Sequence, residues 1–507
     1  MTRFIAAALV SLLLLGPLAS QPRRNQNSHC AISLADHLDE QSEKAEALIE
    51  IAKLHLKAGD KVSADQLLFE SFKWIALTRD GLKAGRLVNL LEIASREHLD
   101  KAVEIGKPIT GSDGTWALRR LIVAHGQFGL HNEANELLSE GIRRIHARNK
   151  KERWYGDQDY ELALFVGDAA TAGLVPRALR VARGIKDPFV RANVLRPAAI
   201  KLADDKQCRR ALAVARSIHY EIERIDVLVD VANTCNAAGD KLSARAALSG
   251  ALAETRKDIF DPEQDTKTKA LVSISLAYEK IGERAIGLTI LTRAEKFAYT
   301  IEKPGFKDSG LSQVALAYFQ YGQLDDALRV TSHIPSPWSN TKANTLADMG
   351  GSFFTTGNRD KALAAITEAE QVVKDIDCAY FKYGISARSC FGDKVSNFLK
   401  IASVYEQAQL FPKEVEMLDL AVLHNQYKVK PPHQIIKEGS SIIGDDAVGE
   451  LEIVQRYLAA KQIGRAIDVA SGIMSPRDKV VAVAMIELSS DKNDSKVQSL
   501  LRSRFKC

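Results

Sequence analysis

The sequence predicts an all-α superhelix (solenoid) of about eleven helical hairpins. Three observations lead to this fold class. A small residue, a Gly seven positions later and an Ala five positions beyond recur along most of the 507 residues. Apolar residues at three- and four-residue spacing flank each Gly, as in amphipathic helices. The copies are roughly 32 to 52 residues apart, the period range of helical solenoids.

The unit is clearest between Val231 and Ala251, with landmarks at Ala232, Gly239 and Ala244. The Gly can adopt the left-handed conformation that ends a helix, and the small residues let two antiparallel helices approach closely. One hairpin cannot bury its apolar face alone, so stability must come from stacking neighbours. The other complete copies are Ala52/Gly59/Ala64, Val166/Gly173/Ala178, Ala315/Gly322/Ala327 and Gly350/Gly357/Ala362.

Incomplete copies fill the intervals between these units. Around Gly282 the small residue is Ser275, and Gly287 replaces the Ala. Around Gly129 only the Gly and Ala134 remain, and a shortened copy lies near Ile93 to Ala102. Three copies lack the Gly, at Ala199/Lys206/Ala211, Ala402/Gln409/Glu414 and Val454/Lys461/Ala466.

This spacing resembles the tetratricopeptide repeat, a 34-residue helical hairpin. The family's small residue, aromatic, Gly and Ala stand in this chain at Ala315, Tyr318, Gly322 and Ala327. A second copy has Gly350, Phe353, Gly357, Ala362 and Ala369, and Tyr278 and Tyr405 fill the aromatic position in two more. The early Trp of the family is absent, and several units are longer than 34 residues. The resemblance covers about residues 43–490.

In that family the first helices line a concave face that binds extended peptides or partner helices. The resemblance therefore implies partner contacts from the first helices, although the family's carboxylate clamp of Lys, Asn and Arg is not reproduced. Each residue alone is better explained as a solvated or packing position than as a binding hot spot. The implied contact residues are Lys53, Asn233, Asn236, Glu279, Phe319, Gln320, Phe354, Glu406 and Gln407.

The second helices are of two predicted kinds. Short ones are expected at 178–185, 211–218, 327–334 and 466–473, three of which are followed closely by Pro188, Pro335 and Pro476. Longer ones are expected at 362–374 and 287–299, which continue for another turn or more before a polar linker. This mixture explains the uneven period.

Both ends of the chain fall outside the repeats. Arg3 and the apolar run from Phe4 to Leu15 have the layout of a secretory signal peptide over residues 1–20, with an uncleaved anchor as the alternative. Residues 21–42 are expected to form a linker and 491–507 a tail. We therefore expect an extracytoplasmic protein, periplasmic or secreted, without a membrane span after cleavage.

Insertions are expected near 106–116, 148–159, 375–395 and 424–446. Insertions in solenoids collect at unit ends and often form binding loops. The 375–395 segment holds Tyr380, Phe381, Tyr383 and Phe391. These aromatics would serve recognition if exposed, and would pack under the loop otherwise.

Six cysteines in an exported chain predict disulfides. Cys378 and Cys390 flank one insertion and are the first candidate pair. Cys208 and Cys235 are a second candidate pair, because they lie near the same edge of adjacent units. Cys30 and Cys507 lie in opposite tails that a long solenoid would hold apart, so we expect either to be free or to pair between chains.

No catalytic, metal or cofactor motif is found. The P-loop, dinucleotide-binding, nucleophile-elbow, zinc-protease and Cys-x-x-Cys patterns are all absent. A net charge of +5 over 507 residues does not indicate a nucleic-acid partner. Paired Asp residues such as Asp204–Asp205 are better explained as helix caps than as acid–base pairs.

The sequence therefore predicts an exported, non-enzymatic scaffold that binds a protein or peptide on its concave face. One alternative is an accessory or unrecognised enzyme whose substrate cleft is shaped by the solenoid. Another is a structural protein that self-associates, for example through Cys507.

Overall fold

The computed structural model describes residues 29–148, 158–257, 265–334, 340–376, 387–429, 447–473, 475–490 and 495–505. Within these ranges the regular secondary structure is entirely helical. The first helices of the hairpins are α3 (Gln41–Lys57), α5 (Asp80–Leu91), α7 (Gly111–Gln127), α9 (Gln158–Thr171), α11 (Pro188–Asp204), α13 (Glu221–Ala237), α15 (Thr266–Lys280), α17 (Pro304–Gln320), α19 (Thr341–Thr355), α21 (Ala387–Gln407) and α23 (Ala447–Ala459).

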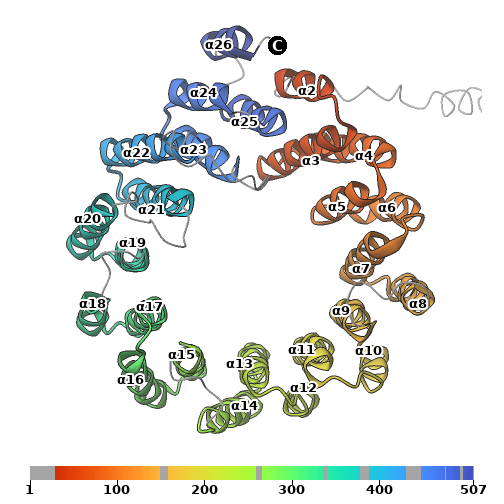
Figure 1. Ribbon diagram of the computed structural model, residues 1–507, viewed down its shortest axis with the longest axis vertical. Coiled ribbons are helices and arrows are strands. Elements are labelled where there is room, and N and C mark those ends of the chain that lie inside the picture. The colour runs from red at the N-terminus through yellow and green to blue at the C-terminus, as the bar shows by residue number, and fades with distance from the viewer. Residues whose placement is uncertain are drawn as a thin grey trace, which may run out of the picture. The chain divides into compact units, whose positions relative to one another are not determined.

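The remaining helices complete the hairpins and the two ends of the chain (Figure 1). The second helices are α4 (Lys61–Leu77), α6 (Leu99–Gly106), α8 (His131–Arg148), α10 (Val175–Ala182), α12 (Cys208–Arg216), α14 (Lys241–Glu254), α16 (Arg284–Thr300), α18 (Leu324–Ser332), α20 (Arg359–Asp375), α22 (Phe411–Val429) and α24 (Ile463–Gly472). The end helices are α2 (His29–Asp36), α25 (Pro476–Ser489) and α26 (Ser495–Phe505), and a short 3-10 helix, η2 (Arg96–His98), precedes α6.

All eleven predicted turns are present. Ten have a residue with positive φ at the predicted position, where the helix-ending left-handed conformation satisfies the last carbonyls. Seven of these residues are Gly, and the other three are Lys206, Gln409 and Lys461, with φ of 59°, 58° and 56°. At Lys206 the following amide, of Gln207, donates to the Leu202 carbonyl at 2.8 Å, as a Gly-containing turn would. The eleventh turn, at Ile93 to Ala102, contains η2 instead.

Gly287, which replaces the expected Ala, is explained by Tyr321. A Cβ at Gly287 would lie 2.9 Å from the Ser275 carbonyl oxygen and would overlap the Tyr321 hydroxyl. That hydroxyl donates to the Ser275 carbonyl at 2.6 Å, and Ser275 Oγ donates to the Gly287 carbonyl at 2.8 Å. The two departures from the repeat, Ser275 and Gly287, therefore belong to one buried hydrogen-bond network.

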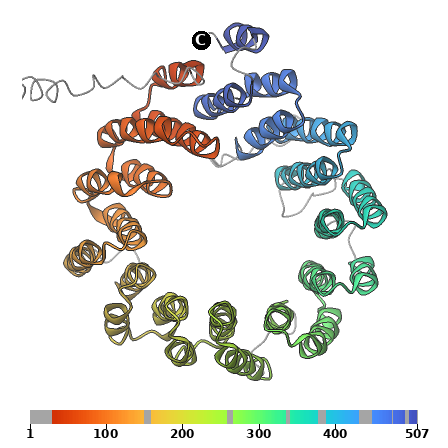
Figure 2. The same cartoon turned by 180° about the vertical axis from the view of Figure 1, so that it is seen from behind.

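The chain divides into two compact units. Unit 1 combines the N-terminal part of the chain, up to Leu77, with the C-terminal part, from Ile463 onward. Unit 2 runs from Thr78 to Gln462. In unit 1, α25 packs against both α2 and α3, as both views show (Figures 1 and 2). Residues 43–490, expected to form one solenoid, are thus shared between two units.

Buried polar contacts join the two ends of the chain within unit 1. The Glu487 carboxylate accepts hydrogen bonds from the backbone amides of Cys30 at 3.0 Å and Ala31 at 3.1 Å, which caps the start of α2. Arg477 forms an ion pair with Glu46 at 2.6 Å. Cys30 is itself disulfide-bonded. The expectation that Cys30 is free or bonded to another chain is therefore wrong, because its bond lies within this one chain.

Several expected linkers are partly helical. The 21–42 linker holds α2, and the 491–507 tail holds α26. The expected insertion at 106–116 is reduced to residues 107–110, because α7 begins at Gly111. Pro188 and Pro476 each occupy the first position of a following helix, where the missing amide costs nothing. The signal segment 1–20 and Cys378 lie outside the described residues.

Candidate interaction surface

The first helices of unit 2 form one continuous side of that unit. Each first helix from α5 to α21 contacts the next first helix along the chain. Among the described second helices, α12 and α14 make a contact of that kind, and any contact between the other consecutive ones is weaker. The closer spacing of the first helices places them along the concave side of unit 2 (Figure 1). This is the side on which the tetratricopeptide resemblance expects a partner.

The nine predicted contact residues lie toward the C-terminal ends of their first helices. Lys53 is in unit 1, on α3, and the other eight are in unit 2. Gln320 and Gln407 are exposed, whereas the other seven are half-buried. The structure thus brings the unit 2 members to one end of the first helices.

Several of these residues already join neighbouring helices. Asn236 Nδ2 donates to the Lys280 carbonyl at 3.0 Å, linking α13 to α15. Phe319 packs edge-on against Phe353, with ring centroids 4.8 Å apart. Glu406 accepts from Arg456 at 3.4 Å, linking α21 to α23. These contacts give the predicted residues a packing role between hairpins.

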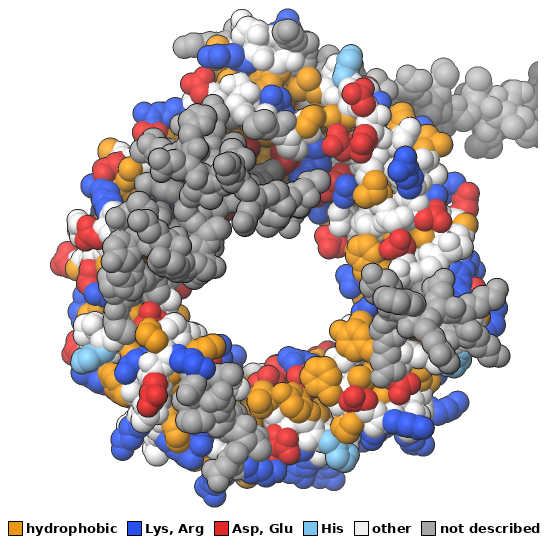
Figure 3. All heavy atoms as spheres, viewed as in Figure 1, with side chains coloured by type: hydrophobic (Ala, Val, Ile, Leu, Met, Phe, Trp, Pro, Cys, Tyr) orange, Lys and Arg blue, Asp and Glu red, His pale blue; other side chains and the backbone are white. Residues whose placement is uncertain are grey.

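Large apolar side chains are exposed at the opposite, N-terminal ends of the first helices. The exposed fractions are 40% for Trp116, 44% for Tyr160, 54% for Phe189 and 41% for Tyr220. These four residues, here named the aromatic row, belong to the starts of α7, α9, α11 and α13. Figure 3 shows hydrophobic side chains along the concave side over these helices. Sequence reasoning missed them because they stand outside the repeat landmarks.

Contacts between hairpins hold parts of the aromatic row in place. Phe189 and Tyr220 meet edge to face with ring centroids 5.5 Å apart. A Cβ at Gly85 of α5 would lie 3.7 Å from the Trp116 ring, so this ring lies against α5. Asp187 accepts hydrogen bonds from the amides of Phe189 and Val190, which fixes the first turn of α11.

Carboxylates lie on α13 next to the Phe189–Tyr220 pair. Glu223, Asp226 and Asp230 recur at three- and four-residue spacing and therefore share one face of α13. Arg196 of α11 donates to Glu223 at 2.9 Å and to Asp230 at 3.0 Å. These three carboxylates, here named the α13 carboxylates, thus face a single guanidinium.

The environment of the α13 carboxylates disfavours the ionised forms of Asp226 and Asp230. Asp226 reaches solvent, but neighbouring helices displace part of its hydration shell. That desolvation raises the pKa of Asp226, and the charge of Glu223 raises it further despite Arg196. Desolvation is also the main cause that raises the pKa of Asp230. No cation of the described residues forms an ion pair with Asp226.

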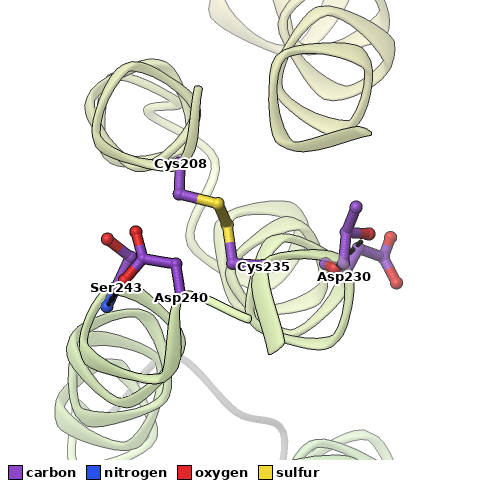
Figure 4. The surroundings of a disulfide bond; sticks show 6 residues. Cys208, Asp230, Cys235, Asp240 and Ser243 are labelled. Atoms are coloured by element: carbon purple, nitrogen blue, oxygen red, sulfur yellow. Dashed lines mark hydrogen bonds between the residues drawn. A yellow bond between two sulfur atoms is a disulfide. The ribbon is translucent and has the colours of Figure 1, made fainter. Parts of the chain in front are cut away.

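A disulfide fastens α12 to α13 behind this surface. Cys208 and Cys235 are bonded, with Cα atoms 5.8 Å apart, and both side chains are buried (Figure 4). The second predicted pair is therefore confirmed, while the first pair, Cys378–Cys390, lies outside the described side chains. Below the disulfide, Asp240 accepts from the Ser243 amide at 3.0 Å and caps α14. This region is held both covalently and by helix capping.

Two classes of feature are absent from the described part of the chain. None of its helices combines the length and apolarity needed to cross a membrane. None of its described residues forms a cluster of three or more His, Cys, Asp or Glu side chains placed to hold a metal ion.

No protein-family model and no curated protein matches the chain. Solved structures with similar helices include a Rap protein complexed with competence and sporulation factor, 16% identical with a TM-score of 0.27, covering 66% of this chain and 99% of that one. The human IFIT1 dimer with PPP-AAAA is 14% identical with a TM-score of 0.27, covering 78% and 94%. Ton1535 from Thermococcus onnurineus is 12% identical with a TM-score of 0.26, covering 87% and 98%.

TM-scores this low carry no argument about partners or activity. The fold assignment rests on the chain's own turns, helix pairs and contacts. By these features the chain is a tetratricopeptide-like helical repeat protein.

Proposed function

We propose that this chain is a scaffold that binds a protein partner along the first helices of unit 2. The aromatic row is the observation that supports this most directly. Isolated exposed apolar residues are common, but four large ones on consecutive first helices form a patch of the kind that marks interaction sites. Aromatic residues also dominate the energetics of protein interfaces.

The proposal includes a location outside the cytoplasm. The signal-peptide pattern of residues 1–20 supports export. The buried Cys208–Cys235 disulfide supports it as well, because such bonds persist in oxidising compartments. The nine residues predicted from the resemblance are a second proposed contact set, toward the C-terminal ends of other first helices, and only α13 belongs to both sets.

Site-specific photocrosslinking tests the binding role. A photoreactive phenylalanine analogue replaces Tyr160 or Phe189 in the full chain, and a control carries it at Leu242. Leu242 is a matched control because it is 83% exposed but lies on α14, a second helix. We expect the same saturable protein adduct from Tyr160 and Phe189, identified by mass spectrometry, and none from Leu242.

Two results would contradict this function. The first is equal labelling from all three positions, which would indicate nonspecific contact. The second is an adduct only with further copies of this chain, which would support self-association instead. Export is tested separately, by finding whether the native protein in the extracytoplasmic fraction begins after residue 20.

A further inference from the structure

The spacing of the aromatic row restricts the shape of what it binds. Adjacent packed helices lie about 8 to 10 Å apart, so Trp116, Tyr160 and Phe189, on three consecutive first helices, offer contacts at about that interval. Tyr220 meets the Phe189 ring with centroids 5.5 Å apart and therefore forms one contact site with it. A polyproline II segment repeats every three residues and rises about 3.1 Å per residue, which gives a repeat of about 9 Å. An extended segment with an apolar residue at every third position therefore matches the row.

The charge beside the row restricts the chemistry of that segment. The α13 carboxylates carry two more negative charges than Arg196 neutralises, counting three carboxylates against one guanidinium. Asp113 lies at the start of α7, three residues before Trp116. A basic segment would complement these charges, whereas the phosphates of a nucleic acid would be repelled.

Aromatic rings and carboxylates together suit one side chain above others. The guanidinium of Arg stacks on aromatic faces and also pairs with carboxylates in two parallel hydrogen bonds. The Phe189–Tyr220 pair and Asp226 supply both kinds of partner, from the first two turns of α11 and α13. Arg196 occupies Glu223 and Asp230, which leaves Asp226 to an external cation.

We infer that the aromatic row and the α13 carboxylates bind an extended basic segment of a partner protein, with an apolar residue at about every third position and an arginine against Asp226. This inference rests on the proposed scaffold function and specifies its partner. A second copy of this chain or a single-stranded RNA would be a different occupant, and the test separates them.

The test uses fluorescein-labelled peptides and the full mature chain. One peptide repeats Arg-Pro-Leu five times, and its matched control repeats Glu-Pro-Leu. Fluorescence anisotropy at low and at physiological salt measures both affinities. We expect the arginine peptide to bind at least about tenfold more tightly than the glutamate peptide, with an advantage that shrinks as salt rises.

Three variants place the interaction on the surface. Phe189→Ala and Asp226→Asn should each weaken binding of the arginine peptide by about three- to tenfold. Leu242→Ala, on the exposed side of α14, should leave it unchanged. Circular dichroism and thermal melting confirm that each variant is folded.

The inference is overturned if the two peptides bind equally or if both surface variants retain full affinity for the arginine peptide. It is also overturned if a single-stranded RNA of similar length binds while the arginine peptide does not, or if labelled chain binds only itself. If neither peptide binds but the photoreactive analogue at position 189 still forms an adduct with a native protein, the inference fails and the scaffold function remains supported. Loss of that adduct would instead contradict the function itself.

Discussion

The second helices α10 and α12 have 8 and 9 residues, whereas α16 and α20 in the following part of unit 2 have 17 residues each, with α18 of 9 residues between them. The position three residues after the small landmark differs as well. It holds Leu202 and Cys235 in the earlier part, and Tyr318 and Tyr405 in the later part. The two parts therefore join consecutive hairpins by different chemistry.

In the later part, tyrosines bond to carboxylates of the preceding second helix. Tyr318 donates to Glu295 and Tyr405 donates to Glu370, both at 2.7 Å. Each Glu stands eleven residues after the first residue of its helix, at 284 and 359. α10 and α12, with 8 and 9 residues, end before that position. The carboxylate bond thus needs a second helix that reaches this position, and the shorter α12 is joined to α13 by a disulfide instead.

The largest expected effect comes from removing that disulfide. Cys208→Ser with Cys235→Ser should lower the free energy of unfolding by about 3 to 4 kcal/mol, because the bond closes a loop of sequence separation 27. Hydrogen exchange should rise mainly between α9 and α14. An equal rise between α15 and α22 would show that the two parts are not fastened independently.

The next effect concerns Glu414 of α22, which occupies the Ala landmark. Its side chain is fully buried and neither carboxylate oxygen has a hydrogen-bond partner among the described residues. Burial raises the pKa of Glu414 to about 7, with Glu406 adding to the effect and Arg456 opposing it. The folded state therefore favours the protonated form.

A raised folded-state pKa makes stability fall as the pH rises from the unfolded value toward 7. Glu414→Gln should therefore stabilise the protein by about 2 to 3 kcal/mol at pH 8 and much less at pH 5. Urea unfolding at both pH values measures this difference. A gain that is the same at pH 5 and pH 8 would rule out ionisation as the cause.

Tyr405→Phe should cost about 1 to 2 kcal/mol, because it removes a hydroxyl that donates to the buried Glu370. Tyr278→Phe is the matched control, since that hydroxyl lies 3.4 Å from Ser249 Oγ and forms at best a weak bond. Thermal melting compares the two variants. Phe preserves the ring packing in both variants. Equal losses of stability would therefore show that the Tyr405–Glu370 hydrogen bond contributes no more than the weak contact of Tyr278.

The smallest expected effect tests what the two parts share. Lys206→Gly in the earlier part and Gln409→Gly in the later part should each stabilise by about 0.5 to 1 kcal/mol, because both native residues have positive φ. Similar gains would show that the turns are equivalent even though the fastenings differ. Gly239→Ala provides the reverse control, with an expected loss, since φ at Gly239 is 89°.

The repeat could be predicted because its landmarks are local. A turn that needs positive φ selects Gly, and the fixed seven-residue spacing from the preceding landmark identified Lys206, Gln409 and Lys461 even without a Gly. The same register made Cys208–Cys235 a second candidate pair, because both residues lie near the same edge of adjacent hairpins, and the structure contains this bond.

Long-range features left no comparable local pattern. The packing of α25 against α2 and α3 joins segments from opposite ends of the chain. The aromatic row was also missed, because one aromatic residue per hairpin becomes a surface only when α7 to α13 are stacked side by side. The predicted contact residues lie on the expected helices, but helix-to-helix bonds such as Asn236 to Lys280 depend on neighbours that no single repeat specifies.

The Glu487 cap on α2 has a consequence for the order of biosynthesis. Translation adds roughly 5 to 20 residues per second, so the roughly 400 residues between Leu77 and Pro476 take about 20 to 80 s. Throughout that interval the nascent α2 and α3 lack the helix that covers them. Unit 1 is therefore begun first and completed last, and a chain terminated before Pro476 leaves its first-made helices open to chaperones and proteases.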